Sequence, residues 1–342
     1  MRRLVLLALL LGLIGLAQSA PVRAYPGHWH PDIRFATGSV GWVSGREGIM
    51  ATRNGGRSWH RQVSGQFVKA LEAVDARHAW AITPDSVLAT SNGGRTWASH
   101  RPPEALAAID FVDSHVGWAL TLEGKLLGTR DGGVTWQSVH EPVLLDSVCL
   151  SSANRGLAAR GRIVYSTHDA GRTWAVVHRA RLPTFDSNVA PLLRCRGAGA
   201  WLMITGSFAA GSQGYAAYST RDGIHWRLVL GQFLKQRVPR LDAYAGPFSV
   251  LTPSTGFFVG FCPACGRGTS LVARTRDGGR HWQRSRRGLA GYWPLALSFA
   301  DRRTGFLLTS ESDAGRGGLG GVVWKTADGG RTWRRVLRSA AL

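Results

Sequence analysis

The sequence predicts an all-β fold, a seven-bladed β-propeller of four-stranded blades, on three observations. An eight-residue pattern, TRDGGVTW at residues 129–136, occurs seven times along the 342 residues. The tryptophans that close successive copies are 38 to 56 residues apart, which is the spacing of a repeated supersecondary unit. The chain also contains 44 glycines and 14 tryptophans, as expected of short strands joined by tight turns with regularly spaced aromatic side chains. A four-stranded unit cannot bury both of its faces alone, so seven such units are expected to pack around a ring.

The repeated pattern, here called the box, predicts a hairpin turn. Its copies occupy residues 52–59, 90–97, 129–136, 167–174, 220–226, 275–282 and 326–333, and the fifth copy is one residue short. Asp or Asn at the third position tolerates a left-handed backbone, the glycines supply positive φ, and the tryptophan anchors the hairpin in an apolar layer. We therefore assign a structural role, and no catalytic one, to Asn54, Asn92, Asp131, Asp169, Asp222, Asp277, Asp328, Trp59, Trp97, Trp136, Trp174, Trp226, Trp282 and Trp333.

Each repeat is expected to contain four strands, A to D from the first to the last. The residue three before each box threonine is apolar, which indicates a strand C that leads into the box. A glycine or alanine followed by a large apolar residue, such as Gly117 and Trp118, marks strand B. A further apolar segment, clear at residues 107–111, 248–251 and 295–299, marks strand A, and strand D begins at the box tryptophan. How the ring closes stays open; a strand from residues 25–30 is one way to complete blade 7.

The first 24 residues are typical of a secretory signal peptide, which leaves residues 25–342 for the propeller. Arg2 and Arg3 precede a 14-residue apolar run at residues 4–17, which is short for a membrane span. Cleavage after Ser19 or Ala24 fits the small residues there, and an uncleaved N-terminal anchor is the alternative. Either way, the body of the protein is expected to be exported, to the periplasm or the medium.

Four cysteines in an exported chain suggest structural disulfides. Cys262 and Cys265 can close a local loop, and Cys149 and Cys195 precede the second strands of consecutive repeats and can link neighbours. A redox-active CxxC pair is less well supported, because the thioredoxin-like βαβ context is missing. A metal site would need two further ligands nearby, and none is evident; no metal or cofactor is expected.

The formal net charge of +21 suggests an acidic partner. Export makes nucleic acid the weakest of the possible partners, so none is expected, and an acidic protein or an anionic envelope component remains. The alternative is that the arginines reflect compositional bias and are spread over solvated faces.

The box resembles the Asp-box, or BNR, repeat of sialidases and related glycosidases. The longer frame of a Gly-Trp strand, an apolar strand and T-x-D-G-G-x-T-W more closely resembles the photosystem II assembly and stability factor family of propellers, over about residues 30–340. The resemblance implies a non-enzymatic assembly factor that holds a membrane-protein segment or another protein client, and we expect a monomer. It does not identify that client.

In propellers whose blades each contain strands A to D with the box between C and D, the A–B and C–D turns lie on one face. The B–C and D–A loops lie on the other face. The longest loops fall in blades 5 to 7, on the B–C and D–A face, where recognition is expected to reside. Arginine forks suit carboxylates and aromatic rings supply contact area. The candidate partner-binding residues are Lys235, Arg237, Arg240, Arg267, Arg284, Arg286, Arg287, Arg316, Tyr244 and Trp293. The arginines of the boxes fall on the opposite rim and are interpreted as turn residues without a binding role. They are Arg57, Arg95, Arg172, Arg280 and Arg331.

A glycoside hydrolase, sialidase-like or related, is the alternative function. Sialidases that this repeat resembles carry an Arg-Ile-Pro motif before the first box, but here the nearest string, Arg181, Leu182 and Pro183, follows the fourth box. Other hydrolases with this repeat need two carboxylates facing each other across a cleft. Nothing in their spacing pairs the candidates outside the boxes, which are Asp186, Asp242, Glu311 and Asp313.

Overall fold

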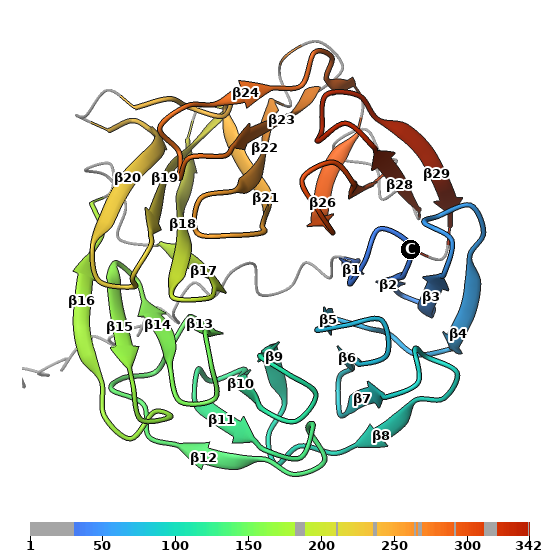
Figure 1. Cartoon of the computed structure of the whole chain (residues 1–342), viewed down its shortest axis with the longest axis vertical. Helices are drawn as coiled ribbons and strands as arrows, with labels where there is room; N and C mark the ends of the chain where they lie inside the picture. The colour runs from blue at the N-terminus through green and yellow to red at the C-terminus, as the bar shows by residue number, and fades with distance from the viewer. Residues whose placement is uncertain are drawn as a thin grey trace, which may run out of the picture.

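The computed structural model shows seven antiparallel sheets arranged around a central axis (Figure 1). It describes residues 31–342 except 182–188, 210, 235–237, 263–264, 266–268, 291, 311–319 and 341. The expected signal peptide, residues 1–24, and the segment 25–30 therefore lie outside the described residues. Within the described part there is no helix, and hence no helix long and apolar enough to cross a membrane. The predicted all-β propeller is confirmed.

Each blade is a sheet of strands that are consecutive in the sequence, and the first strand of each blade is the innermost (Figure 1). The strands are β1 (Ile33–Phe35), β2 (Gly41–Gly45), β3 (Gly48–Thr52) and β4 (His60–Ser64) in blade 1; β5 (Ala70–Ala73), β6 (Ala79–Ile82), β7 (Val87–Thr90) and β8 (Ala98–His100) in blade 2; β9 (Leu106–Phe111), β10 (Gly117–Thr121), β11 (Leu126–Thr129) and β12 (Gln137–Val139) in blade 3; β13 (Ser147–Leu150), β14 (Gly156–Arg160), β15 (Ile163–Thr167) and β16 (Ala175–Arg179) in blade 4; β17 (Ala190–Arg196), β18 (Gly199–Ala209), β19 (Ser212–Thr220) and β20 (Trp226–Gln232) in blade 5; β21 (Tyr244–Val250), β22 (Gly256–Cys262), β23 (Thr269–Thr275), β24 (Gln283–Arg284) and β25 (Leu289–Ala290) in blade 6; and β26 (Trp293–Phe299), β27 (Gly305–Ser310), β28 (Gly321–Thr326) and β29 (Arg334–Ser339) in blade 7. In blade 6 the outermost strand is interrupted, so that β24 and β25 both pair with β23.

The box forms the C–D turn through a closed set of hydrogen bonds. In blade 3, the Thr129 hydroxyl donates to Asp131 Oδ1 (2.7 Å) and accepts from the Gly133 amide (2.9 Å). The Thr135 amide donates to Asp131 Oδ1 (2.9 Å), and its hydroxyl donates to Oδ2 (2.5 Å). Gly132 and Gly133 have φ values of 75° and 89°, as the turn requires. These bonds close the turn between β11 and β12 within the box itself.

The glycine of the Gly-aromatic pair is required by an aromatic ring that lies over it. Gly117 faces Phe111 across β9 and β10, and a Cβ at Gly117 would come within 2.5 Å of the Phe111 ring. The ring of Phe111 in turn stacks on Trp80 of blade 2, with a centroid distance of 3.7 Å. The same stack joins Phe306 to Phe35 and Phe257 to Phe299. Strand B of one blade is thus packed on strand A of the next, which buries the face that a single blade leaves open.

Polar side chains add a second join between blades, here called the box clasp. A side chain in one blade donates a hydrogen bond to the carbonyl of the first box glycine in the next blade. The five clasps in the described residues are Lys325 to Gly55, Gln62 and Arg53 to Gly93, Trp80 to Gly132, Ser219 and Arg227 to Gly278, and Arg274 to Gly329. Between blades 4 and 5 a disulfide, Cys149–Cys195, makes the cross-link.

Among the strands that the structure describes, none is exchanged between blades 7 and 1 where the ring closes. Both blades contain four strands of their own, and a shared core that includes Ile33, Phe35, Phe306 and Leu342 fills the space between them. The Phe35 amide donates to Ser298 Oγ (2.9 Å), which joins the two innermost strands. Blade 7 is therefore complete without a strand from residues 25–30.

The two faces of the ring divide the loops as expected. The Gly132 amide, in the box of blade 3, donates to the His115 carbonyl (2.9 Å) in the A–B turn of the same blade. The Leu145 amide, in the loop that leads to blade 4, donates to the Gly124 carbonyl (2.7 Å) in the B–C turn of blade 3. We call the first side the box face and the second the loop face.

Candidate functional site

Six of the ten residues expected to bind a partner lie in the described part of the structure. They are Arg240, Tyr244, Arg284, Arg286, Arg287 and Trp293, all in blades 5 to 7. The other four, Lys235, Arg237, Arg267 and Arg316, lie outside the described residues.

An aromatic cluster lies where the innermost strands of blades 6 and 7 begin. Tyr244 opens β21 and Trp293 opens β26, and both rings pack against Phe261 at the end of β22, with centroid distances of 6.4 and 4.5 Å. Phe261 is buried, whereas Tyr244 and Trp293 are half-buried. Sequence reasoning missed Phe261, although it lies directly opposite Tyr244 in the register of the two strands. Because both strands enter from the loop face, the cluster lies at the loop-face end of the ring centre.

The chain that enters this cluster is held by a buried tyrosine that sequence reasoning also missed. Tyr215 Oη accepts hydrogen bonds from the amides of Leu241 (2.6 Å) and Asp242 (3.3 Å) and donates to the Asp242 carbonyl (3.1 Å). Burial raises the pKa of Tyr215 to about 12, so the hydroxyl keeps its proton and both of its roles. The segment before Tyr244 is therefore fixed by the blade beneath it.

The predicted arginines divide into two groups. The Arg284 guanidinium donates to the Arg240 carbonyl, which places both residues at the junction of blades 5 and 6. The Arg286 amide donates to the Arg331 carbonyl (3.4 Å) in the box of blade 7, so Arg286 lies at the outer edge of the ring. Arg287 follows it and is exposed. Only Arg240, among these four, lies in the segment that leads directly into the aromatic cluster.

The two predicted cysteine pairings are present. Cys262 and Cys265 are joined with a Cα separation of 5.3 Å, and Cys149 and Cys195 are joined with a separation of 5.5 Å. Asp242 lies beside the first pair, with the potential ligand atoms of the three residues within 4.8 Å of one another. With both sulfurs in a disulfide, neither is a thiolate, so this group is not a metal site in the oxidised protein.

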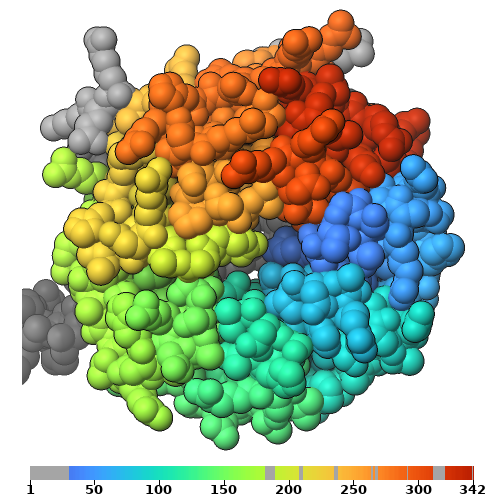
Figure 2. All heavy atoms as spheres, viewed as in Figure 1, coloured from blue at the N-terminus to red at the C-terminus, as the bar shows by residue number. Residues whose placement is uncertain are grey.

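The centre of the ring contains a charge cluster that sequence reasoning did not find. Its members lie on the innermost strands β1, β5, β9 and β17 or next to β1, around the opening at the ring centre in Figure 2. They are Asp32, Arg34, Glu72, Asp110, Arg194 and Arg196. A detectable signal was present, since charged residues interrupt strands that are otherwise apolar or small.

Ion pairs and backbone contacts occupy the carboxylates of this cluster. Arg34 pairs with Asp32 (2.8 Å) and Glu72 (3.5 Å), and Asp110 Oδ2 accepts from the Leu150 amide (2.6 Å) of the next blade. Burial, together with the negative charge of Glu72, raises the pKa of Asp110 to about 6 despite the Leu150 hydrogen bond. The cluster joins blades electrostatically, and it holds one carboxyl group that can take up a proton near neutral pH.

The structure is thus a seven-bladed β-propeller of four-stranded blades, with an aromatic cluster at the loop-face end of the ring centre. No family model matches the chain, and no curated protein matches it. Among solved structures, YCF48 bound to D1 peptide is similar with a TM-score of 0.55 and 19% identity, over 86% of this chain and 97% of that chain. YCF48 from Cyanidioschyzon merolae gives a TM-score of 0.56 and 18% identity, over 85% and 96% of the two chains.

A hydrolase shares the fold as well. The GH74 xyloglucanase from Xanthomonas campestris has a TM-score of 0.62 and 15% identity, and the match covers 91% of this chain and 54% of that one. The resemblance to photosystem II assembly-factor propellers is thus confirmed at the level of fold. Identities this low establish the architecture alone.

Proposed function

We propose that this protein is a non-enzymatic binding propeller that holds an acidic segment of a protein client on its loop face. The observation that carries this proposal is the cluster of Tyr244, Phe261 and Trp293 at the ring centre, reached through Arg240. Half-buried aromatic rings provide contact area at low entropic cost, and arginine forks recognise carboxylates. The similar propeller YCF48 is bound to D1 peptide in its own structure, which supports a peptide segment as the ligand class.

The partner is expected to bind electrostatically at first and to be anchored by the rings afterwards. The net charge of +21 raises the rate of encounter with an acidic partner, and this contribution falls with increasing salt. Lys235, Arg237, Arg267 and Arg316 lie outside the described residues and stay candidates from the sequence alone.

Charge reversal on the loop face tests the proposal. The client would be captured from envelope extract at low salt, identified, and titrated against purified protein by fluorescence anisotropy. We expect R240E/R284E to weaken binding at least tenfold and Trp293→Ala to weaken it comparably. The matched control R130E/R172E, which reverses two exposed arginines on the box face, should bind as the wild type does. Wild-type affinity in R240E/R284E, or equal weakening in the control, would show that this surface is not the site.

We further propose that the protein works in an oxidising compartment, as an exported periplasmic or secreted protein. Two disulfides among the described residues support this compartment. Mass spectrometry of the protein isolated from its native cells should show an N-terminus after Ser19 or Ala24. A retained N-terminus together with reduced cysteines would contradict it.

A hydrolase is the second candidate, because Glu72 and Asp110 act on each other electrostatically and the pKa of Asp110 is raised to about 6. A carboxyl group that is protonated near neutral pH is what a general acid needs. Both groups are, however, engaged with Arg34 or Leu150, which favours a structural role. Hydrolysis of xyloglucan or a sialoside by the wild type, abolished in both E72Q and D110N, would establish the hydrolase instead of the binding propeller.

A further inference from the structure

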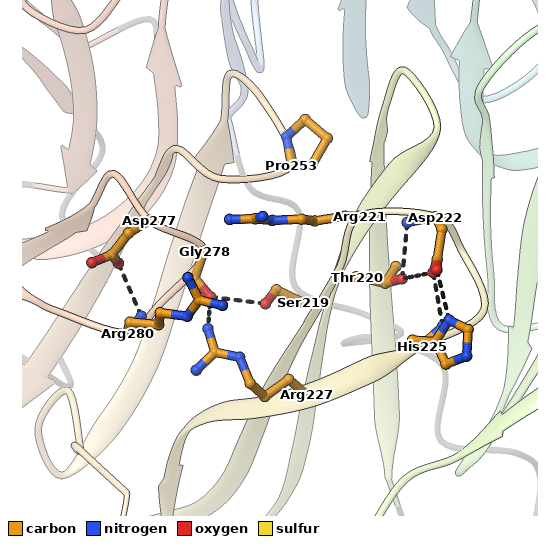
Figure 3. Close-up of a pocket in the computed structure, with 10 residues that line it drawn as sticks. All are labelled: Ser219, Thr220, Arg221, Asp222, His225, Arg227, Pro253, Asp277, Gly278 and Arg280. Carbon is orange, nitrogen blue, oxygen red and sulfur yellow. Dashed lines mark hydrogen bonds and ion pairs between the residues drawn. The ribbon is translucent and has the colours of Figure 1, made fainter.

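A pocket of about 250 Å³ lies on the box face, between the box turns of blades 5 and 6 (Figure 3). Its walls come from the box of blade 5, the start of β20, the A–B turn of blade 6 at Pro253 and the box of blade 6. It is therefore on the opposite side of the ring from the loop-face site.

A short residue before the box threonine of blade 5 leaves room for the hollow. In blades 6 and 7 the residue before the box threonine is long, Arg274 or Lys325, and fills the junction while it makes the box clasp. In blade 5 the same position is Ser219, whose short side chain makes the clasp to Gly278 (2.9 Å) and leaves the space beside it open. The box of blade 5 is also the copy that is one residue short.

Three arginines line this pocket. Arg221 belongs to the box of blade 5, Arg227 to β20 and Arg280 to the box of blade 6, and Figure 3 shows their guanidinium groups directed toward the region around Gly278. Arg227 donates one hydrogen bond to the Gly278 carbonyl. Its pKa is lowered by burial and then by the positive charges of Arg280 and Arg221, against the opposing charge of Asp277, so the three cations are close enough to repel. Arg280 is therefore a member of this group of cations as well as a residue of the box turn.

The two carboxylates in the pocket wall are already occupied. Asp222 accepts from the Thr220 hydroxyl (3.0 Å), the Ile224 amide (2.9 Å) and both the amide and the ring of His225 (2.8 and 2.7 Å). Asp277 accepts from Thr275 and from the backbone and ring of His281 in the same way. Among the described residues, neither carboxylate forms an ion pair with Arg221, Arg227 or Arg280. Within the described part of the chain, the pocket thus presents three guanidinium groups that form no ion pair with the carboxylates in its wall.

We propose that this pocket binds a small oxyanion, a carboxylate or phosphate group, between Arg221, Arg227 and Arg280. Guanidinium forks bind both groups in a bidentate manner. The volume is below the roughly 300–1,000 Å³ of sites for drug-sized ligands, which favours a single anionic group over an extended molecule. The site is independent of the loop-face surface and shares no residue with it.

Titration with two simple anions tests this site and separates its possible ligands. Inorganic phosphate and citrate would each be titrated by isothermal calorimetry at constant ionic strength against chloride. We expect saturable one-to-one binding of at least one of them, with the preferred anion identifying phosphate or carboxylate as the ligand. R221Q/R280Q should weaken that binding at least tenfold, while the matched control R95Q/R172Q, which alters exposed box arginines of blades 2 and 4, should leave it unchanged.

The loop-face variant R240E/R284E should bind the anion as the wild type does, so failure of the client-binding proposal does not affect this result. Absence of saturable binding of both anions to the wild type would overturn the proposal. Wild-type binding by R221Q/R280Q, or equal loss in the control, would also overturn it.

Discussion

At the residue scale, the box tolerates both Asn and Asp because one of its hydrogen bonds can be reversed. In blade 1, Asn54 Nδ2 donates to the Ser58 hydroxyl (2.8 Å), whereas in blade 3 the Thr135 hydroxyl donates to Asp131 Oδ2 (2.5 Å). In both boxes the Oδ1 atom accepts from the backbone amide four residues later. The turn therefore requires one side-chain oxygen acceptor, and its second atom can be a donor or an acceptor.

This requirement predicts different costs for two substitutions at one position. Asp131→Asn should change the free energy of unfolding by less than about 1 kcal/mol, because Oδ1 is kept and the hydroxyl can reverse its role. Asp131→Ala should cost roughly 1–3 kcal/mol, because it leaves the Thr135 amide and the Thr129 hydroxyl without their acceptor. Urea denaturation measures both values, and equal costs for Asn and Ala would contradict the assignment.

Asp110 predicts a pH dependence of stability with a definite sign. Its pKa is about 6 in the folded protein and near the ordinary value of about 3.9 when unfolded, so the wild type loses stability as pH rises from about 4 to 6. Asp110→Asn cannot ionise but keeps an acceptor for the Leu150 amide. The stability of the variant relative to the wild type should therefore rise by roughly 1–2 kcal/mol between pH 4 and pH 7, allowing for the partial solvent exposure of the group. Thermal unfolding at both pH values tests this, and a difference that does not change with pH would refute it.

At the element scale, neighbouring blades are joined by devices that differ in chemistry but recur in position. An aromatic stack joins strand B to the next strand A, and a box clasp joins a side chain of one blade, such as Arg274 at the end of a strand C, to the next box. Each device reaches from one blade to the following one, so a blade is held on both sides by different residues. The box is therefore both a hairpin turn and an acceptor for the preceding blade.

The clasp between blades 6 and 7 can be tested with two arginines that lie on either side of Thr275 in the sequence. Arg274 is 5% exposed and donates to the carbonyls of Asp328 and Gly329 (both 3.1 Å), whereas Arg276 is exposed. Arg274→Met keeps the apolar stem but leaves both carbonyls without this donor, and should lower the free energy of unfolding by roughly 1–3 kcal/mol. Arg276→Met removes the same charge and should cost less than about 0.5 kcal/mol. A similar loss in both variants would indicate an effect of charge alone.

At the scale of the whole molecule, the disulfide between blades 4 and 5 replaces a clasp by a covalent bond. Cys149 and Cys195 are 46 residues apart, so the bond restricts the unfolded chain strongly. The double substitution C149S/C195S should lower the free energy of unfolding by roughly 2–4 kcal/mol. The Cys262–Cys265 disulfide closes a much shorter loop, so the double substitution C262S/C265S should lower the free energy of unfolding less. Denaturation without reductant measures both losses. A larger loss from the second pair would contradict this order.

Sequence reasoning recovers the repeating parts of this molecule and misses the parts that arise between repeats. Strands, faces and box roles follow from seven copies of one pattern, and the cysteine pairs follow from their positions in it. The cluster around Arg34 and Asp110 and the pocket at Arg227 depend on residues from different blades meeting across a gap. Their separations in sequence, 38 residues between Arg34 and Glu72 for example, carry no local signal of contact.

The bond from Lys325 to Gly55 has a consequence for where such a chain can begin. It is a box clasp like those at internal junctions, although it joins the last blade to the first. Because each blade is completed by its own four strands, the seam between the ends of the chain is chemically one junction among seven. A circularly permuted gene that opens the ring in another exposed connection is therefore expected to encode the same propeller, whichever blade comes first in the gene.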